Sequence, residues 1–422
     1  MAAYSCITDL LDRLLSSSSG DPRLSAQMAQ VISEGVLRRA LESTDELCHV
    51  ALYDWMVGRQ LTDKLLQVNS PFLELYLQSK LRSCSGGLDT PMTMRLWDLL
   101  WEYYEKDGRF AEAAALLLKL AEKHSTQVNL SKRLTYLSRA VMCAKSAQET
   151  SKGAGGDDGG LLAELEDKLE VARLQLMIHD RLKRLSDPTQ QQQRPLSEAL
   201  GKLNADLLDV TQLYGEYAEA FGLPDCKLAI LHCAGHAEEP MINEIWRQIV
   251  EGELKERARD TTDSKMKRLE TKLLELSRLY SNSPRYFPAE FLIKILATKS
   301  FECGFPTKWL PTIGRRLAGL SVELVLAVLE QLYAQRDSQW RRNPQAGQHL
   351  LRMVLEIMNG CVEEGSRVQI DDRRKLVNRC QDTISGYLVD LEGRSSGQNV
   401  ELLNQFKTLQ VKLDRLKSSS NF

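Results

Sequence analysis

Residues Leu96–Thr126 read LWDLLWEYYEKDGRFAEAAALLLKLAEKHST, which predicts a helix, a tight turn and a second helix. On the first helix Trp97, Trp101 and Tyr104 recur at the helical period, so they share one face. An Asp-Gly pair then breaks the helix. This stretch decides the fold, because each of its helices is apolar on a face that it cannot bury alone.

The second helix of this pair places small side chains beside large ones. The small residues let another backbone approach closely, and the leucines fill the space between; they are Ala111, Ala113, Ala114 and Ala115, then Leu116, Leu117 and Leu120. Helix pairs of this kind must stack on their neighbours. If they fill the chain, we expect a solenoid rather than a globule.

Length and composition indicate a folded chain of either several domains or one elongated array, without the charge of a protein that binds nucleic acid or an anionic membrane. The chain has 422 residues, more than one globular core usually supports, and 43% of them are hydrophobic. Lys plus Arg number 55 and Asp plus Glu 57, so the chain has no broad positive electrostatic potential that would attract nucleic acid or an anionic membrane. We interpret the short basic runs Arg315–Arg316, Arg341–Arg342 and Arg373–Lys375 as solvated helix faces.

No segment predicts a membrane span or a secretory signal. The longest apolar runs, such as Ala113–Leu118 and Leu324–Leu329, fall short of the ~20 residues that a spanning helix needs. Asp9 and Asp12 interrupt the leucines of the N-terminus, which has no basic leader. The nine cysteines are odd in number and scattered, which indicates a reduced compartment, cytosol or nucleus.

Apolar residues recur at three and four throughout, so the predicted class is all-α with no β-sheet. The stretch Leu161–Leu185 predicts a long amphipathic helix. The stretch Val322–Tyr333 is rich in valine, but its helical spacing predicts a buried helix rather than a strand.

Capping signals mark where helices begin. Thr90-Pro91 and Ser283-Pro284 each place a capping side chain before a proline at the first helical position. Ser43 and Glu46 have the spacing of a capping box.

We expect one irregular solenoid interrupted by a loop, because no repeat of ~34 residues carries the Trp97 to Ala115 pattern onward. Its predicted parts are residues 1–145, a flexible loop at 146–160, a long helix and C-terminal part at 161–417, and a disordered tail at 418–422. Two further flexible stretches are expected at 16–23 and 186–195.

One cluster has the residue types of a metal site, within DCKLAILHCAGH: Cys226, His232, Cys233 and His236. Structural zinc sites pair ligands across two to four residues on a turn, whereas these cysteines lie seven apart on one helical face. We interpret the cysteines as core and the histidines as polar residues near a helix C-terminus. The glycine-rich stretch from Gly153 lacks a Walker lysine and is interpreted as a linker.

No catalytic motif occurs, so we expect no enzyme, no cofactor and no metal, and the residues that bind partners stay unknown. The stripe Trp97, Trp101 and Tyr104 could line a peptide groove, but its spacing favours core packing. Tyr286, Phe287 and Phe291 around a proline leave the same two alternatives open.

Eight segments, in this order, resemble the C-terminal region of the nucleoporin 155/170 family. They are YSCITDLLDRL (4–14), LTDKLLQVNSPFLELYL (61–77), LWDLLWEYYEKDGRF (96–110), LAEKHST (120–126), DCKLAILHCAGH (225–236), PRYFP (284–288), SGYLVDLE (385–392) and FKTLQVKLDRL (406–416). Their common order, rather than any single motif, carries the resemblance over nearly the whole chain.

The resemblance implies a non-FG scaffold of the inner ring of the nuclear pore complex, in the nuclear envelope, without catalysis and supporting transport of protein and mRNA. It implies docking of short segments of linker nucleoporins, such as nucleoporin 53 (also called 35) and nucleoporin 98. The family carries a β-propeller ahead of its solenoid, and this sequence has no strand-rich region. We therefore expect a C-terminal fragment or truncated product, with membrane contact only from the missing propeller.

Two other classes of function stay open from the residues alone. Helix pairing would equally suit an adaptor solenoid of a vesicle coat or proteasome lid. An enzyme with an unrecognised helical site is the third class, although no nucleophile, base and orienting group occur together in the sequence.

Overall fold

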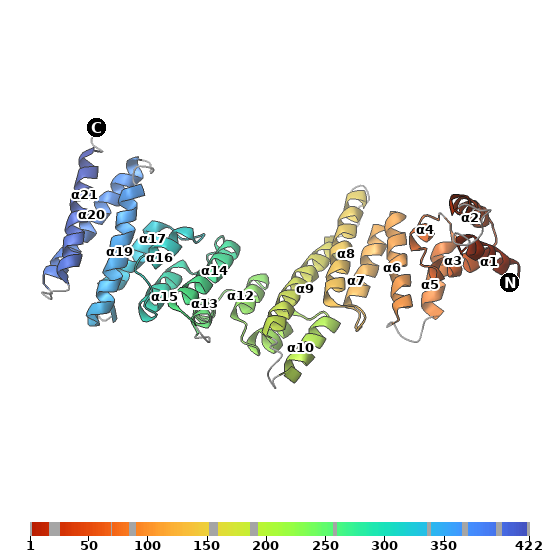
Figure 1. Ribbon diagram of the computed structural model, residues 1–422, viewed down its shortest axis with the longest axis horizontal. Coiled ribbons are helices and arrows are strands. Elements are labelled where there is room, and N and C mark those ends of the chain that lie inside the picture. Colours follow the sequence, from red (N-terminus) through yellow and green to blue (C-terminus); the bar gives the residue numbers. More distant parts are fainter. Residues whose placement is uncertain are drawn as a thin grey trace. The chain divides into compact units, whose positions relative to one another are not determined.

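The computed structural model describes residues 2–16, 26–68, 70–83, 90–151, 159–185, 193–255, 260–335, 339–364, 370–393 and 399–419. Every regular element in these ranges is a helix, and no strand occurs in them (Figure 1). The predicted all-α class is confirmed. The helices form two compact units, Met1–Cys226 and Lys227–Phe422.

Unit 1 contains short and long helices that follow one another closely in the chain. Their bounds are α1 Ala2–Ser16, α2 Ala26–Leu41, α3 Glu46–Gly58, α4 Thr62–Leu66, α5 Phe72–Ser83, α6 Pro91–Lys106, α7 Phe110–Glu122, α8 Leu130–Ser151, α9 Gly159–Leu185, α10 Gln193–Ala205, α11 Val210–Gln212, a π-helix η2 Leu213–Glu219, and α12 Pro224–Cys233, which crosses into unit 2.

The helix pair predicted for Leu96–Thr126 is confirmed as α6 and α7, which lie side by side within unit 1 (Figure 1). The chain turns between them at Gly108, whose φ of 76° lies in the left-handed region that glycine tolerates. On α7 the small residues Ala113 and Ala114 are fully buried, so they allow the close helix packing that their size predicted. The same prediction was wrong for Ala111, which is exposed, and Ala115 is only partly buried.

The capping predictions were right at one helix of unit 1 and wrong at another. The hydroxyl oxygen of Thr90 accepts a hydrogen bond from the backbone N–H of Thr93 at 3.2 Å, which starts α6 as expected. The box predicted for Ser43 and Glu46 is absent, because Asp45 is the N-cap of α3 and accepts from the backbone N–H of Leu47 at 3.0 Å.

Arg133 of α8 is fully buried and holds the ends of two other helices. Its guanidinium donates to the carbonyl oxygens of Ala121 at 2.6 Å, Lys123 at 2.7 Å and Ser125 at 3.0 Å, and to that of Ala205. Burial lowers the pKa of this guanidinium. These bonds satisfy carbonyls that the ends of α7 and α10 leave without intrahelical partners, and so join both ends to α8.

Gln175 of α9 has a matching role. Its side chain is fully buried, and its amide nitrogen donates to the carbonyl oxygens of Leu203 and Asp206, both at 2.6 Å. Its amide oxygen accepts from the backbone N–H of Leu208 at 2.9 Å. The connection between α10 and α11 is thereby fixed on α9 by a side chain rather than by helix packing.

Unit 2 also consists of helices joined by short connections. Their bounds are α13 Glu239–Leu254, α14 Thr262–Tyr280, α15 Ala289–Glu302, α16 Trp309–Arg316, α17 Val322–Ala334, α18 Gln339–Arg342, α19 Pro344–Glu364, α20 Ile370–Glu392 and α21 Asn399–Ser419. The helix predicted for Val322–Tyr333 is confirmed as α17, and the long helix of unit 1 predicted for Leu161–Leu185 is confirmed as α9.

The start predicted at Ser283-Pro284 was wrong, because α15 begins only at Ala289. The turn before it is anchored in the core, since the indole N–H of Trp246 donates to the carbonyl oxygen of Tyr286 at 2.8 Å. Tyr286 and Phe287 are buried, which favours core packing for these two of the three aromatic residues; Phe291 is partly exposed, and the guanidinium of Arg247 lies 5.6 Å from its ring.

The expected loop at 146–160 lies partly outside the described residues. Helix α8 continues to Ser151 and α9 begins at Gly159, so only residues 152–158 are left for a connection. Most of the stretches 16–23 and 186–195 also lies outside, as do residues 420–422 of the expected tail. The continuity of one solenoid through 1–145 and 161–417 stays a prediction.

We expect Arg133→Met to lower the free energy of unfolding of unit 1 by ~3–5 kcal/mol, because buried carbonyl oxygens lose their donors. Hydrogen exchange should become faster in residues 121–130 and 203–208. Arg173→Met, at an exposed position of α9, is the control and should change neither quantity. Equal exchange in both variants would contradict the assigned role of Arg133.

A methyl group at Gly347 should destabilise unit 2. A Cβ there would lie 2.6 Å from the carbonyl oxygen of Trp340, which is backbone and cannot move aside freely. We expect Gly347→Ala to cost ~1–3 kcal/mol in chemical denaturation. The matched control is Gly386→Ala in α20, which meets no atom within 4 Å and should stabilise its helix by ~0.5–1 kcal/mol.

His349 should make unit 2 less stable in mild acid. Burial lowers its pKa below the ordinary 6.5, and Arg352 adds to this effect. The unfolded chain therefore binds the proton more readily, so this contribution to stability is present above pH 6.5 and is lost as the pH falls below it. The free energy of unfolding is measured by chemical denaturation at several pH values between 7.5 and 5.5, a range chosen to avoid carboxylate titration. In His349→Gln it should depend less on pH than in the wild type. The exposed His236→Gln should keep the wild-type slope.

Candidate docking grooves

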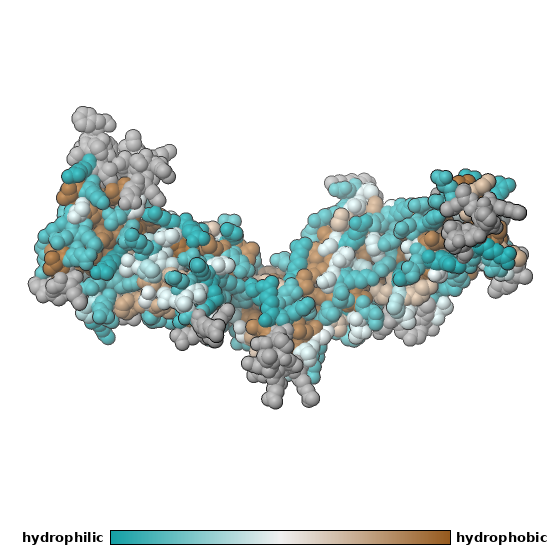
Figure 2. Space-filling view, in the orientation of Figure 1, coloured by the Kyte–Doolittle hydropathy of each residue, from teal (hydrophilic) through white to brown (hydrophobic). Residues whose placement is uncertain are grey.

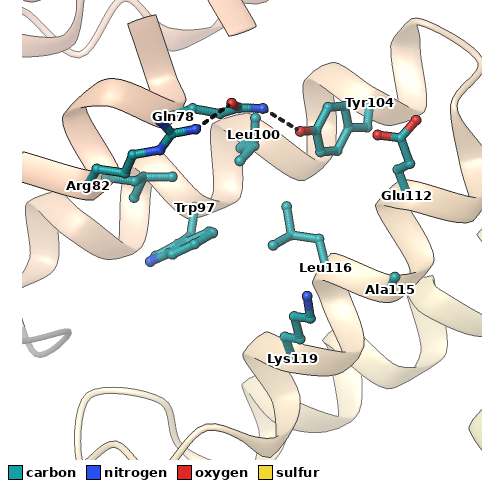
Figure 3. Close-up of a pocket in the computed structure, with 10 residues that line it drawn as sticks. Gln78, Arg82, Trp97, Leu100, Tyr104, Glu112, Ala115, Leu116 and Lys119 are labelled. Carbon is teal, nitrogen blue, oxygen red and sulfur yellow. Dashed lines mark hydrogen bonds between the residues drawn. The ribbon is translucent and has the colours of Figure 1, made fainter. Parts of the chain in front are cut away.

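The first groove lies between α5, α6 and α7 and has a volume of about 420 Å³. We call it the α5–α7 groove. In Figure 3, Trp97, Leu116 and Lys119 border its open space, and Ala115 adds only a methyl group to the wall. Its lining residues are Gln78, Leu81, Arg82, Trp97, Leu100, Tyr104, Glu112, Ala115, Leu116 and Lys119.

A hydrogen-bond network fixes one rim of the α5–α7 groove. The amide nitrogen of Gln78 donates to the hydroxyl of Tyr104 at 3.2 Å (Figure 3). The same nitrogen donates to Glu74 at 3.0 Å, and the hydroxyl of Tyr104 donates to Glu74 at 3.2 Å. Arg109 binds Glu74 at 2.7 Å and lies over the ring of Tyr104 at 4.5 Å. Burial raises the pKa of Tyr104, so the phenol keeps the proton that it donates to Glu74.

The charges without a close partner in the α5–α7 groove are positive. Glu112 is bound by Arg109 at 2.7 Å, which compensates its charge. Lys119 makes no hydrogen bond or ion pair with any residue that the structure describes, and Arg82 has only a long bond of 3.4 Å to Gln78. The groove therefore combines an apolar wall with two available cations.

The prediction that the aromatic stripe of α6 is core was right for only one of its three residues. Tyr104 is buried, whereas Trp97 and Trp101 are partly exposed and lie at the border of the core. Trp101 lies 5.9 Å from the guanidinium of Arg139 on α8. Trp97 lines the groove, and its N–H, which has no acceptor among the described residues, points away from the open space (Figure 3).

The second groove lies between the end of α7, α9 and the connection from α10 to α11, and its volume is about 410 Å³. We call it the acidic groove. Hydrophobic residues gather over α8 and α9 on the face shown in Figure 2, bordered by hydrophilic ones. The groove is lined by Glu122, Asp167, Lys168, Val171, Ala172, Leu207, Leu208, Asp209 and Val210.

The apolar wall of the acidic groove includes two leucines on a connection rather than on a helix. Leu207 and Leu208 are partly exposed, and the three bonds of Gln175 to residues 203, 206 and 208 fix the backbone that carries them. Sequence reasoning missed these residues. The available signal was the motif DLLD at 206–209, since two leucines between aspartates outside a helix have no helical face to bury them.

Three carboxylates and one ammonium line the acidic groove. Lys168 binds Glu122 and, at 2.7 Å, Glu164. Burial lowers the pKa of Lys168, but these two bonds outweigh the effect and raise it. Its charge is therefore compensated within the chain. Asp167 is exposed and pairs with no cation among the described residues, and the carboxylate of Asp209 accepts only from the backbone N–H of Gln212 at 2.8 Å.

The cysteines and histidines considered for a metal site do not converge. Cys226 is buried and Cys233 partly buried on α12, while the rings of His232 and Tyr286 meet edge-on with their centroids 4.8 Å apart. His236 follows the helix end and lies 3.6 Å from Glu238. Within the part of the chain that the structure describes, no three His, Cys, Asp or Glu side chains are arranged to hold a metal ion.

Among the described helices, none has both the length and the apolar composition needed to cross a membrane.

Comparison with known proteins gives one family. The family model described as "Non-repetitive/WGA-negative nucleoporin C-terminal" matches residues 1–399. The chain is 31% identical over 383 residues to the nuclear pore complex protein Nup154 of Drosophila melanogaster, a match that covers 90% of this chain and 26% of Nup154. The chain thus spans about a quarter of the length of this curated relative.

Solved structures match the fold over nearly the whole chain. A mutant of the Chaetomium thermophilum Nup170 CTD superposes with a TM-score of 0.73 at 22% identity, covering 98% of this chain and 79% of that one. The complex of the same CTD with Nup145N gives a TM-score of 0.64 at 22% identity, covering 97% and 79%. At this identity the likeness supports the helical fold alone.

Proposed function

The chain belongs to the family of non-repetitive, WGA-negative nucleoporins, and from that membership we propose that it is a scaffold part of the nuclear pore complex that docks short segments of other nucleoporins. The resemblance of its eight segments to the nucleoporin 155/170 family agrees with this membership. Nucleoporin membership favours a pore scaffold over the vesicle-coat or proteasome-lid adaptor and over an enzyme.

The α5–α7 groove is the observation that carries the docking proposal. Its volume of about 420 Å³ lies within the range of ~300–1,000 Å³ that is typical of ligand pockets. The partly exposed indole of Trp97 gives it the kind of aromatic anchor that dominates binding hot spots. A groove between packed helices takes an extended or helical segment whose apolar side chains fill it.

The related Nup170 CTD, which has been crystallised in complex with Nup145N, supports a nucleoporin as the partner. We propose that the occupants are linker nucleoporins of the nucleoporin 98 and nucleoporin 53/35 kinds. Arg82 and Lys119 favour a segment that carries a carboxylate beside its apolar anchors. In this proposal the chain contributes to the inner ring at the nuclear envelope and thereby to transport of protein and mRNA.

The test is isothermal titration calorimetry, in which the whole chain is titrated with recombinant linker regions of nucleoporin 98 and nucleoporin 53/35 from the same organism. Ala115→Gln fills the groove without removing any packing, and Trp97→Ser removes its aromatic wall. We expect each variant to weaken binding at least ~10-fold, because hot-spot truncations cost more than 1 kcal/mol.

Met142→Ser is the matched control, since Met142 is an exposed apolar residue of α8 that does not line the groove. It should bind as the wild type does. The docking proposal fails if neither linker nucleoporin binds the wild-type chain. If a linker binds and Ala115→Gln leaves its affinity unchanged, the assignment to this groove is wrong.

A further inference from the structure

The acidic groove is built to receive side chains without rearranging. Gln175, which is fully buried, fixes the backbone of Leu207 and Leu208 through hydrogen bonds of 2.6 to 2.9 Å. Asp209 and Gln212 form a reciprocal capping box that fixes the next residues. A preformed apolar surface loses little conformational freedom when it is covered, so exposure of these leucines is useful only if something covers them.

The charge around this apolar surface selects what covers it. Asp167 and Asp209 lie at the groove without a cation of their own, while the ammonium of Lys168 is compensated by Glu122 and Glu164. The groove therefore keeps an uncompensated negative charge beside its apolar wall. Such a surface repels nucleic acid and anionic lipid, and it attracts a polypeptide that carries Lys or Arg.

We propose that the acidic groove is a second docking site, for a partner segment with two closely spaced aliphatic side chains flanked by Lys or Arg. The aliphatic side chains pack on Leu207, Leu208 and Val171, and the flanking cations pair with Asp167 and Asp209. The α5–α7 groove, with Arg82 and Lys119, has the opposite charge. The two grooves of unit 1 thus take segments of different charge. The inference rests on the proposed function only in that both require the chain to bind short segments.

The probe is a displayed library of random twelve-residue peptides, selected on immobilised whole chain that carries Ala115→Gln. This variant has its α5–α7 groove filled, so the selection reports on the rest of the surface. Enriched peptides are synthesised with a fluorophore and titrated by anisotropy at low and high salt. We expect them to share two aliphatic residues and at least two Lys or Arg, and to bind more weakly at high salt.

The decisive variant is Asp167→Asn combined with Asp209→Asn. Asparagine keeps the N-cap of α11 and removes only the charge, so the fold is preserved. We expect this variant to bind the selected peptides at least ~10-fold more weakly, and Val171→Gln, which fills the groove, to do the same. Glu170→Gln, an exposed carboxylate on the same helix that does not line the groove, is the control and should change the affinity less than ~2-fold.

Three results would overturn the second docking site: no enrichment, enrichment of acidic or uncharged peptides, or equal binding by the double variant and the wild type. The proposal that linker nucleoporins dock in the α5–α7 groove would not be affected by any of these results. Conversely, selected basic peptides that depend on Asp167 and Asp209, with no linker binding at all, would support this site and reject the docking of linker nucleoporins.

Discussion

The buried guanidinium of Arg133 is the interaction on which the arrangement of unit 1 depends. A helix ends with carbonyl oxygens that have no partner in the helix, and a helical stack has many such ends close to its core. Arg133 satisfies carbonyls from the end of α7 and the end of α10 with one side chain on α8. Gln175 does the same for the connection after α10. Without these side chains, packing alone would have to orient elements that are far apart in the chain.

This arrangement explains why the two grooves exist where they do. On α7 the buried Ala113 and Ala114 permit close packing, whereas Ala115 adds only a methyl group to the groove wall, and Trp97 and Leu116 lie apart across the groove. At the second groove, Leu207 and Leu208 lie on the connection that Gln175 fixes and line the groove together with residues of α7 and α9. Around the first groove the polar contacts join side chains, whereas at the second groove Gln175 binds the backbone itself. In our proposal these two grooves are the surfaces on which the chain docks its partners.

Much of the fold could be predicted, because helical periodicity is a local property. The spacing of apolar residues was sufficient for α9 and for α17, where it outweighed the β-propensity of the valines. Single capping residues were predicted less well. The N-cap of α3 is Asp45 rather than Ser43, and Ser283-Pro284 lies in the turn before α15 rather than at its start. A capping side chain only shows that a helix can begin there, and the packing of the following residues decides whether it does.

The sequence by itself determined that this chain is a set of amphipathic helices and that it resembles one family of nucleoporins, since both follow from the order of residues along the chain. Only the tertiary structure decided which faces are covered. Trp97 and Tyr104 share one helical face and line the same groove, yet only Tyr104, whose ring lies under the guanidinium of Arg109, is buried. The burial of Arg133 likewise involves Ala205, which lies 72 residues further along the chain. Burial depends on neighbours that are distant in sequence, and periodicity cannot identify them.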